Sequence, residues 1–213
     1  MSPRSKPYHH GALRTALVDA AARIAALRGP EQLTLREVAR HAGVSQAAPY
    51  HYFADKSALV AAVAEEGFRL FDAAQIATLE ASSGDPADQL AELAVSYARF
   101  ALDRPHYFKV MFRPHLVDRA RYPRLAQVAG RVFDRLVDAV RGARLAAGHD
   151  DVDPQAAAMA VWAVPHGLAM LYLDGPLAGT TTPRALETLV RASVRPLAHA
   201  PLDELGRDPE WGI

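Results

Sequence analysis

A run of polar and aromatic side chains after residue 45 contains the groups of this chain that are best suited to direct chemistry. Gln46 can hydrogen-bond an adenine edge, and the methyl groups of Ala47 and Ala48 can meet a thymine methyl. Tyr50 and Lys56 offer a hydroxyl and a cation at the reach expected for phosphates. Together these side chains predict contact with double-stranded DNA.

The residues around this run predict the elements that must position it. Thr34 followed three residues later by Glu37 is a capping box, so a helix should begin there. Gly43 can take the left-handed conformation that ends this helix, and Ser45 then caps a further helix that runs through Phe53. This spacing fits a helix-turn-helix, whose second helix enters the major groove.

The candidate DNA contacts lie at the start of the first helix, along the second helix and at the start of the helix after it. They are Thr34, Arg36, Ser45, Gln46, Ala47, Ala48, Tyr50, His51, Tyr52 and Lys56. The alternative is a small three-helix core with no role on DNA, which leaves the polar and aromatic run unexplained.

The same stretch resembles the N-terminal domain of TetR-type transcriptional regulators. That family has a capped helix, then A-x-x-x-G-V-S, Y-x-H/Y-F and D/N-K-x-x-L. The matching residues are Ala39, Gly43, Val44, Ser45, Tyr50, Tyr52, Phe53, Asp55, Lys56 and Leu59. The resemblance covers residues 7 to about 60 and, in some members, places a base-contacting arginine at the position of Arg36. Tyr52 stands where the family commonly has a second histidine, so which ring contacts a phosphate stays open.

A second segment, AAAMAVWAVPHGLAMLYL, carries Trp162 and His166 on one helix face with Gly167 beside them. It resembles the C-terminal domain of a subset of TetR-type regulators marked by W-x-x-x-H-G. The candidate ligand contacts combine this pair with an aromatic cluster: Phe108, Met111, Phe112, Trp162 and His166. The alternatives are that His166 is a core residue hydrogen-bonded to a carbonyl and that the cluster is solid core.

Charge is distributed unevenly along the chain. The 24 Lys and Arg balance the 24 Asp and Glu, but residues 1–60 hold eight bases against four acids, so this part carries +4 and the rest −4. A basic head on an acidic body is expected of a modular DNA-binding protein. We therefore expect double-stranded DNA as a partner of this chain.

Composition and motifs exclude several other classes. The chain has no cysteine, which excludes disulfides and thiol catalysis, and it lacks the short motifs of metalloproteases, α/β-hydrolases and nucleotide-binding folds. No run approaches about 18 uninterrupted apolar residues, and the N-terminus lacks the apolar stretch of a signal peptide. We therefore expect a cytoplasmic protein that is not an enzyme and has no cofactor, metal or membrane contact.

Helical periodicity without strand alternation predicts an all-α fold of about nine helices. The expected domains are a DNA-binding head at 1–56, an effector-binding and dimerisation body at 57–200 and a loose tail at 201–213. The last two helices should form the dimer interface through Ala158, Val161, Val164, Leu168, Leu171, Leu186, Leu189, Val190, Val194 and Leu197.

The expected function is a homodimeric repressor that a small, largely apolar ligand releases from its operator. The alternative, from another class, is a helical small-molecule-binding or enzymatic protein that retains a vestigial DNA-binding head.

Overall fold

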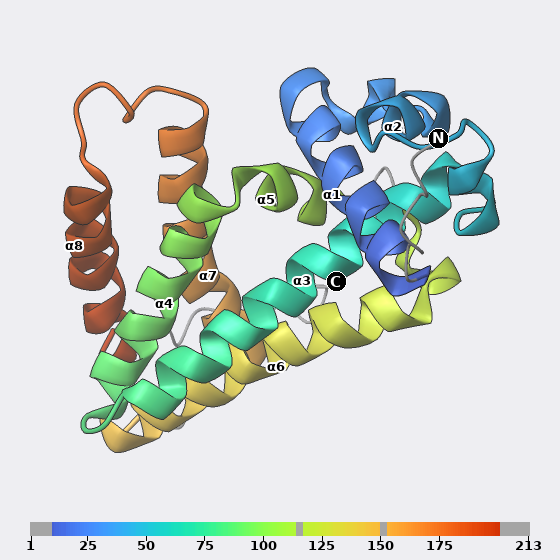
Figure 1. Cartoon of the computed structure of the whole chain (residues 1–213). Coiled ribbons are helices and arrows are strands. Elements are labelled where there is room, and N and C mark those ends of the chain that lie inside the picture. The colour runs from blue at the N-terminus through green and yellow to red at the C-terminus, as the bar shows by residue number, and fades with distance from the viewer. Residues whose placement is uncertain (1–9, 114–116, 150–152, 201–213) are drawn as a thin grey trace. The chain divides into compact units, whose positions relative to one another are not determined.

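The computed structural model describes residues 10–113, 117–149 and 153–200 (Figure 1). The tail expected at 201–213 lies outside them. These described residues contain no strand and eight α-helices: α1 His10–Arg28, α2 Leu35–His41, α3 Lys56–Ala81, α4 Pro86–Asp103, α5 Pro105–Met111, α6 Pro123–Ala146, α7 Pro154–Leu173 and α8 Pro183–Val194. The expected all-α class is confirmed.

One expected α-helix is absent from the described residues, which explains the lower count. In place of a helix from Ser45 to Phe53, the chain forms a 3-10 turn over Ala48–His51. Pro49 has no N–H to donate to the Ser45 carbonyl, and that carbonyl instead accepts from the N–H of Ala48 at 3.0 Å. Hydrogen bonds between residues three apart therefore replace the four-residue hydrogen bonds that the first turn of an α-helix would have.

The starts of α4, α7 and α8 follow from local sequence signals. Asp85, Asp153 and Thr182 each accept a hydrogen bond from a backbone N–H two or three residues later, at 2.9, 3.0 and 3.2 Å. Each is followed by a proline, whose fixed backbone angle and missing N–H suit the first helical position. All three helix starts therefore have a local cause in the sequence.

The chain forms two compact units. The first comprises the chain up to Phe68 together with His106–Ala126, and the second comprises Arg69–Pro105 together with the chain from Gln127 onward. The division falls within α3 and within α6. The functional division expected at residue 56 stays a prediction.

In the first unit, α1 packs on α2, and α5 is attached to both α1 and α3. The hydroxyl of Tyr107, on α5, donates a hydrogen bond to Asp19 on α1. On α3, Gly67 lies so close to α5 that a Cβ there would be 2.7 Å from the side chain of Met111. Neither contact could be predicted from sequence patterns, because these residues are far apart in the chain.

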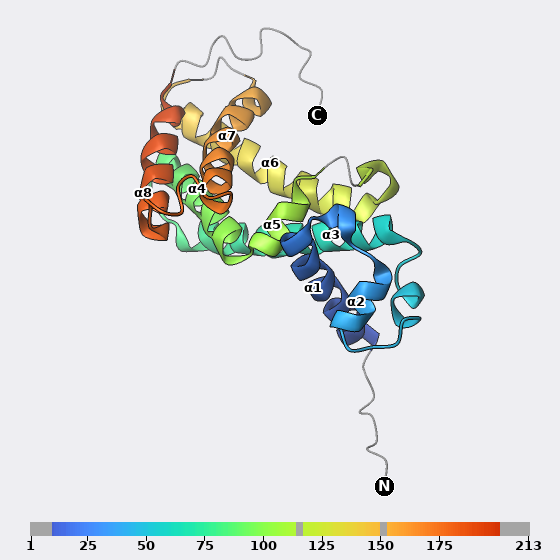
Figure 2. The same cartoon turned by 90° about the horizontal axis from the view of Figure 1, so that it is seen from above.

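In the second unit, α4 contacts both α7 and α8 (Figures 1 and 2). Its core is made of small and branched apolar side chains that are almost completely buried, including Leu90, Val95, Val161, Val190 and Val194. Five of the ten residues expected at the dimer interface are thus covered by their own chain: Ala158, Val161, Leu186, Val190 and Val194. That part of the interface prediction is wrong, since these side chains face inward on α7 and α8.

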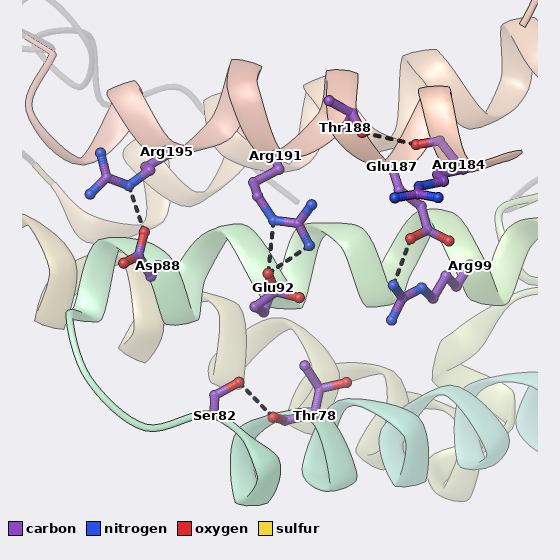
Figure 3. A network of polar contacts seen from close by, with 10 residues as sticks. All are labelled: Thr78, Ser82, Asp88, Glu92, Arg99, Arg184, Glu187, Thr188, Arg191 and Arg195. Carbon is purple, nitrogen blue, oxygen red and sulfur yellow. Dashed lines mark hydrogen bonds and ion pairs between the residues drawn. The ribbon is translucent and has the colours of Figure 1, made fainter. Parts of the chain in front are cut away.

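A row of ion pairs joins α4 to α8 beside this core (Figure 3). The nitrogen–oxygen distances are 2.6 Å for Arg99–Glu187, 2.7 Å for Arg191–Glu92 and 2.5 Å for Arg195–Asp88. Pairs this exposed contribute little to stability, because water and salt screen the charges. Their spacing nevertheless fixes the rotation of α8, so that Val190 faces the core and Leu189 remains 44% exposed.

The apolar helix α7 is largely uncovered within one chain. Among the described helices it alone is long and apolar enough to cross a bilayer, with a mean hydropathy of 1.5 over 18 residues. This measure tolerates the polar residues Gln155 and His166, so it does not contradict the expectation that no uninterrupted apolar run approaches about 18 residues. Only 28% of the apolar window is buried, because a single face of the helix packs into the core.

Candidate nucleic-acid interface

The turn that follows α2 is built by its own backbone hydrogen bonds. Thr34 accepts from the N–H of Glu37 at 3.2 Å, which confirms the predicted start of α2. At the other end Gly43 has φ = +68°, and the N–H of Val44 donates to the carbonyl of Ala39 at 3.0 Å. This is the Schellman arrangement, in which glycine takes the left-handed conformation. The predicted helix and turn are therefore present.

Most of the predicted DNA contacts are exposed, and we call this set the recognition surface: Thr34, Arg36, Ser45, Gln46, Ala47, Tyr50 and His51. Tyr50 is 54% exposed. Buried Pro49 and Phe53 hold the segment to the head, so Tyr50 and His51 are presented outward. Their roles on DNA stay a prediction.

The remaining predicted contacts, Ala48, Tyr52 and Lys56, are half-buried. The ammonium group of Lys56 donates to the backbone carbonyl of Glu31. Asp55 accepts from the N–H of Ala58 at 2.7 Å and so caps α3. Lys56 is thereby held at the start of α3, where its remaining N–H groups can reach a phosphate.

Glu37 has a second contact that the sequence did not predict. Its carboxylate accepts from Arg28, the last residue of α1, at 2.6 Å. The carboxylate lies in a surface depression lined also by Arg36, Arg40 and Gln46. The capping pattern explained the presence of Glu37, so nothing in the sequence pointed to this second contact.

The five candidate ligand contacts fall in both units. Phe108, Met111 and Phe112 belong to the first unit, where the rings of Phe108 and Phe112 are 5.3 Å apart and Phe112 meets Phe68 edge-on at 5.6 Å. Phe108 and Met111 are buried. At Gly67 the close approach of α5 to α3 leaves no space between the two helices. A ligand role for these residues stays a prediction.

Trp162 and His166 lie in the second unit and share a hydrogen-bonded chain with Tyr97. The Tyr97 oxygen is 2.6 Å from Nδ1 of His166 and has a further side-chain hydrogen bond with Trp162. An indole N–H can only donate, so the Tyr97 oxygen accepts from Trp162. Burial raises the pKa of Tyr97 far above its usual range, so this side chain is a neutral phenol. The partner of His166 is therefore a phenol rather than the carbonyl considered from sequence.

Burial also lowers the pKa of His166 below its ordinary value of 6.5. As the pH falls, His166 of the unfolded chain takes up a proton before His166 of the folded protein does, which favours unfolding. The free energy of unfolding therefore keeps its full value above about pH 6.5 and declines as the pH falls toward the pKa of His166 in the folded state. We expect His166→Gln to reduce the difference in unfolding free energy between pH 7.5 and pH 5.5, measured by chemical denaturation. His199→Gln, at an exposed histidine of the same unit, is the control. An unchanged difference in His166→Gln would contradict the assigned environment.

Comparison with known families decides the identity of this fold. The family model described as "Bacterial regulatory proteins, tetR family" matches residues 17–63, and the model described as "Tetracyclin repressor-like, C-terminal domain" matches residues 90–197. The chain is a TetR-family transcriptional regulator. The resemblance to the W-x-x-x-H-G subset stays a prediction.

Solved structures share the fold of this TetR-family regulator. A protein of unknown function from Rhodococcus sp. RHA1 is 30% identical, with a TM-score of 0.73 over 91% of this chain and 97% of that one. The TetR-family regulator PfmR from Thermus thermophilus is 20% identical, with a TM-score of 0.69 over 86% and 97%. AibR, solved with isovaleryl coenzyme A and operator DNA, is 18% identical, with a TM-score of 0.69 over 86% and 98%. A comparison with curated protein sequences gives no match.

Proposed function

We propose that this regulator is a cytoplasmic, homodimeric repressor that acts by binding and not by catalysis. Its head, residues 1–56, binds a double-stranded operator, and a small, largely apolar ligand bound to the body, residues 57–200, releases it. The recognition surface carries this proposal. Gln46, Tyr50 and His51 are exposed in the segment that follows α2 and the turn at Gly43. Residues 1–60, which contain this segment, carry a net charge of +4.

The uncovered face of α7 supports dimerisation. An apolar helix of which so little is buried needs a further covering surface, and Leu171 and Leu189 are 46% and 44% exposed. The neighbouring α8 carries Arg184 and Arg191, and Arg195 follows its last residue, which favours a second copy of the chain over lipid as that cover. Two heads of a dimer would then meet major grooves about 34–36 Å apart.

Support for an effector comes from the aromatic side chains of the chain and from a protein of the same fold. AibR is complexed with both an acyl coenzyme A and its operator, so this fold can bind a small molecule and DNA together. We propose Phe108, Met111, Phe112, Trp162 and His166 as ligand contacts, with few charged groups among them. A ring N–H of His166 would donate to an oxygen of the ligand.

A salt-dependent gel shift on the region upstream of the chain's own gene tests the DNA-binding function. Binding that weakens steeply as salt rises supports it, because each phosphate contact releases counterions. A regulator that binds no duplex at any salt concentration would instead favour the rival, a small-molecule-binding or enzymatic protein with a vestigial head.

Lys56→Ala and Gln46→Ala are expected to weaken DNA binding in different ways. Loss of the cation at Lys56 should reduce affinity similarly for all sequences and lower the salt slope by about one. Loss of Gln46 should change sequence preference and leave the salt slope as it was. Titrations of both variants against the operator and a random duplex measure this. The same uniform loss in both variants would contradict the assigned roles.

A further inference from the structure

A carboxylate lies among three arginines, Arg28, Arg36 and Arg40, beside the recognition surface. Oε1 of Glu37 accepts from Nη1 of Arg28 at 2.6 Å and lies 3.6 Å from Nη2 of Arg40. The Glu37 side chain is 14% exposed, whereas those of Arg28 and Arg40 are 57% and 70% exposed. The same acid shares its surface depression with Arg36 and Gln46, both candidate base contacts.

A negative charge at this place opposes DNA binding and is not required by the helix cap. Thr34 accepts from the backbone N–H of Glu37, and the carboxylate of Glu37 is bonded to Arg28 on another helix. A glutamine at this residue keeps the capping pattern and removes only the charge. A carboxylate in a protein–DNA interface repels phosphates, and it also competes with them for the same cations. The carboxylate therefore acts chiefly on Arg28 and Arg40, whose guanidinium groups must give up or share this acceptor before they bind a phosphate.

The two kinds of DNA complex depend on these arginines to different degrees. Binding to arbitrary sequence consists almost wholly of phosphate contacts, which flexible cations can make in many registers. Binding to an operator adds base contacts, here from Arg36 and Gln46, which fix one register. Holding Arg28 and Arg40 on the protein thus weakens the first kind of complex more than the second.

We infer that Glu37 is a specificity-determining residue, which restrains Arg28 and Arg40 and so lowers affinity for DNA of arbitrary sequence relative to the operator. This role rests on the proposed DNA-binding function. Glu37 would contribute to sequence discrimination through its two ion pairs, without contacting a base.

Glu37→Gln tests this role directly, with Glu65→Gln as the matched control. Both changes raise the net charge by one, but Glu65 lies on α3 and does not line the depression. The probes are a random-sequence duplex and an operator selected from a random pool with the wild-type protein. One freed arginine should steepen the salt slope by about 0.9 and tighten random binding about fivefold near physiological salt. Operator affinity should change less, so discrimination falls in Glu37→Gln and stays at the wild-type value in Glu65→Gln.

A variant of Arg28 separates this role of Glu37 from a general effect of charge. Arg28→Ala alone should leave the random-duplex slope nearly unchanged, because Glu37 already engages that cation. The same change in the Glu37→Gln background should return the slope toward the wild-type value. Thermal unfolding of each variant checks that the head remains folded.

Three results would overturn the role of Glu37 while DNA binding stands. One is equal behaviour of Glu37→Gln and Glu65→Gln, and another is an Arg28→Ala change that has the same effect in both backgrounds. The third is loss of operator affinity with random binding unchanged, which would make Glu37 a base reader or a support for the operator contacts. A wild-type protein that binds neither duplex at any salt would remove the proposed DNA binding itself, and the role of Glu37 with it.

Discussion

Leu189→Arg is expected to convert the proposed dimer to a monomer. Leu189 is 44% exposed on α8, beside the face that buries Leu186, Val190 and Val194. An arginine there would be placed against the apolar surface of a second copy and would lose hydration without an acceptor. Light scattering or analytical ultracentrifugation measures the change in mass.

Affinity for an operator with two half-sites should fall when the dimer is lost. Two heads held in one molecule bind the second half-site at a high effective concentration, and that gain of about 10²-fold or more is lost in a monomer. Binding to a single half-site should change little, since the recognition surface lies on the head. This pair of measurements separates loss of dimerisation from damage to the head.

Leu27→Arg is the control for Leu189→Arg. Leu27 is 82% exposed and belongs to the first unit, whereas α7 and α8 belong to the second, so the same charge is introduced in the other unit. The dimer should survive it. A dimer that also survives Leu189→Arg would remove Leu189 from the interface, and the uncovered face of α7 would then need another cover.

Helix ends and turns could be predicted from the sequence because their causes are local. The Thr34 cap, the left-handed Gly43 and the prolines that open α4, α7 and α8 act within a few residues. Pro49 shows the limit of this approach. The Ser45 cap predicts a helix that runs through this residue to Phe53, yet the missing N–H of Pro49 leaves only a 3-10 turn over Ala48–His51.

Contacts between distant residues could not be predicted from one sequence. The hydrogen bond from Tyr107 to Asp19 and the ion pair of Arg28 with Glu37 join separate elements, and no spacing rule relates them. The faces of α7 and α8 were misassigned for a related reason. The helix α7 is apolar on more than one side, and the single apolar stripe of α8 extends from the core to Leu189. Only the packing on α4 therefore shows that Val161 and Val190 face inward.

Gly67→Ala is expected to destabilise the protein even though alanine favours a helix. A Cβ at Gly67 would lie 2.7 Å from both Cγ and Sδ of Met111 and 3.3 Å from Cβ of Tyr107. Both neighbours are buried on α5, so α5 must move away from α3 or Met111 must take another rotamer. Overpacking of this kind costs about 1–3 kcal/mol, which outweighs the helix preference of alanine over glycine of about 1 kcal/mol.

Gly142→Ala on α6 is the matched control, because nothing lies within 4 Å of a Cβ added there. It should stabilise the protein by about 0.5–1 kcal/mol through the helix preference alone. Chemical denaturation of both variants therefore gives changes of opposite sign. Met111→Ala combined with Gly67→Ala should cost less than the two single changes together, since the shorter side chain makes room for the new methyl group. If Gly67→Ala stabilised the protein as much as Gly142→Ala does, Met111 would move aside freely, and the close contact would not hold α5 against α3.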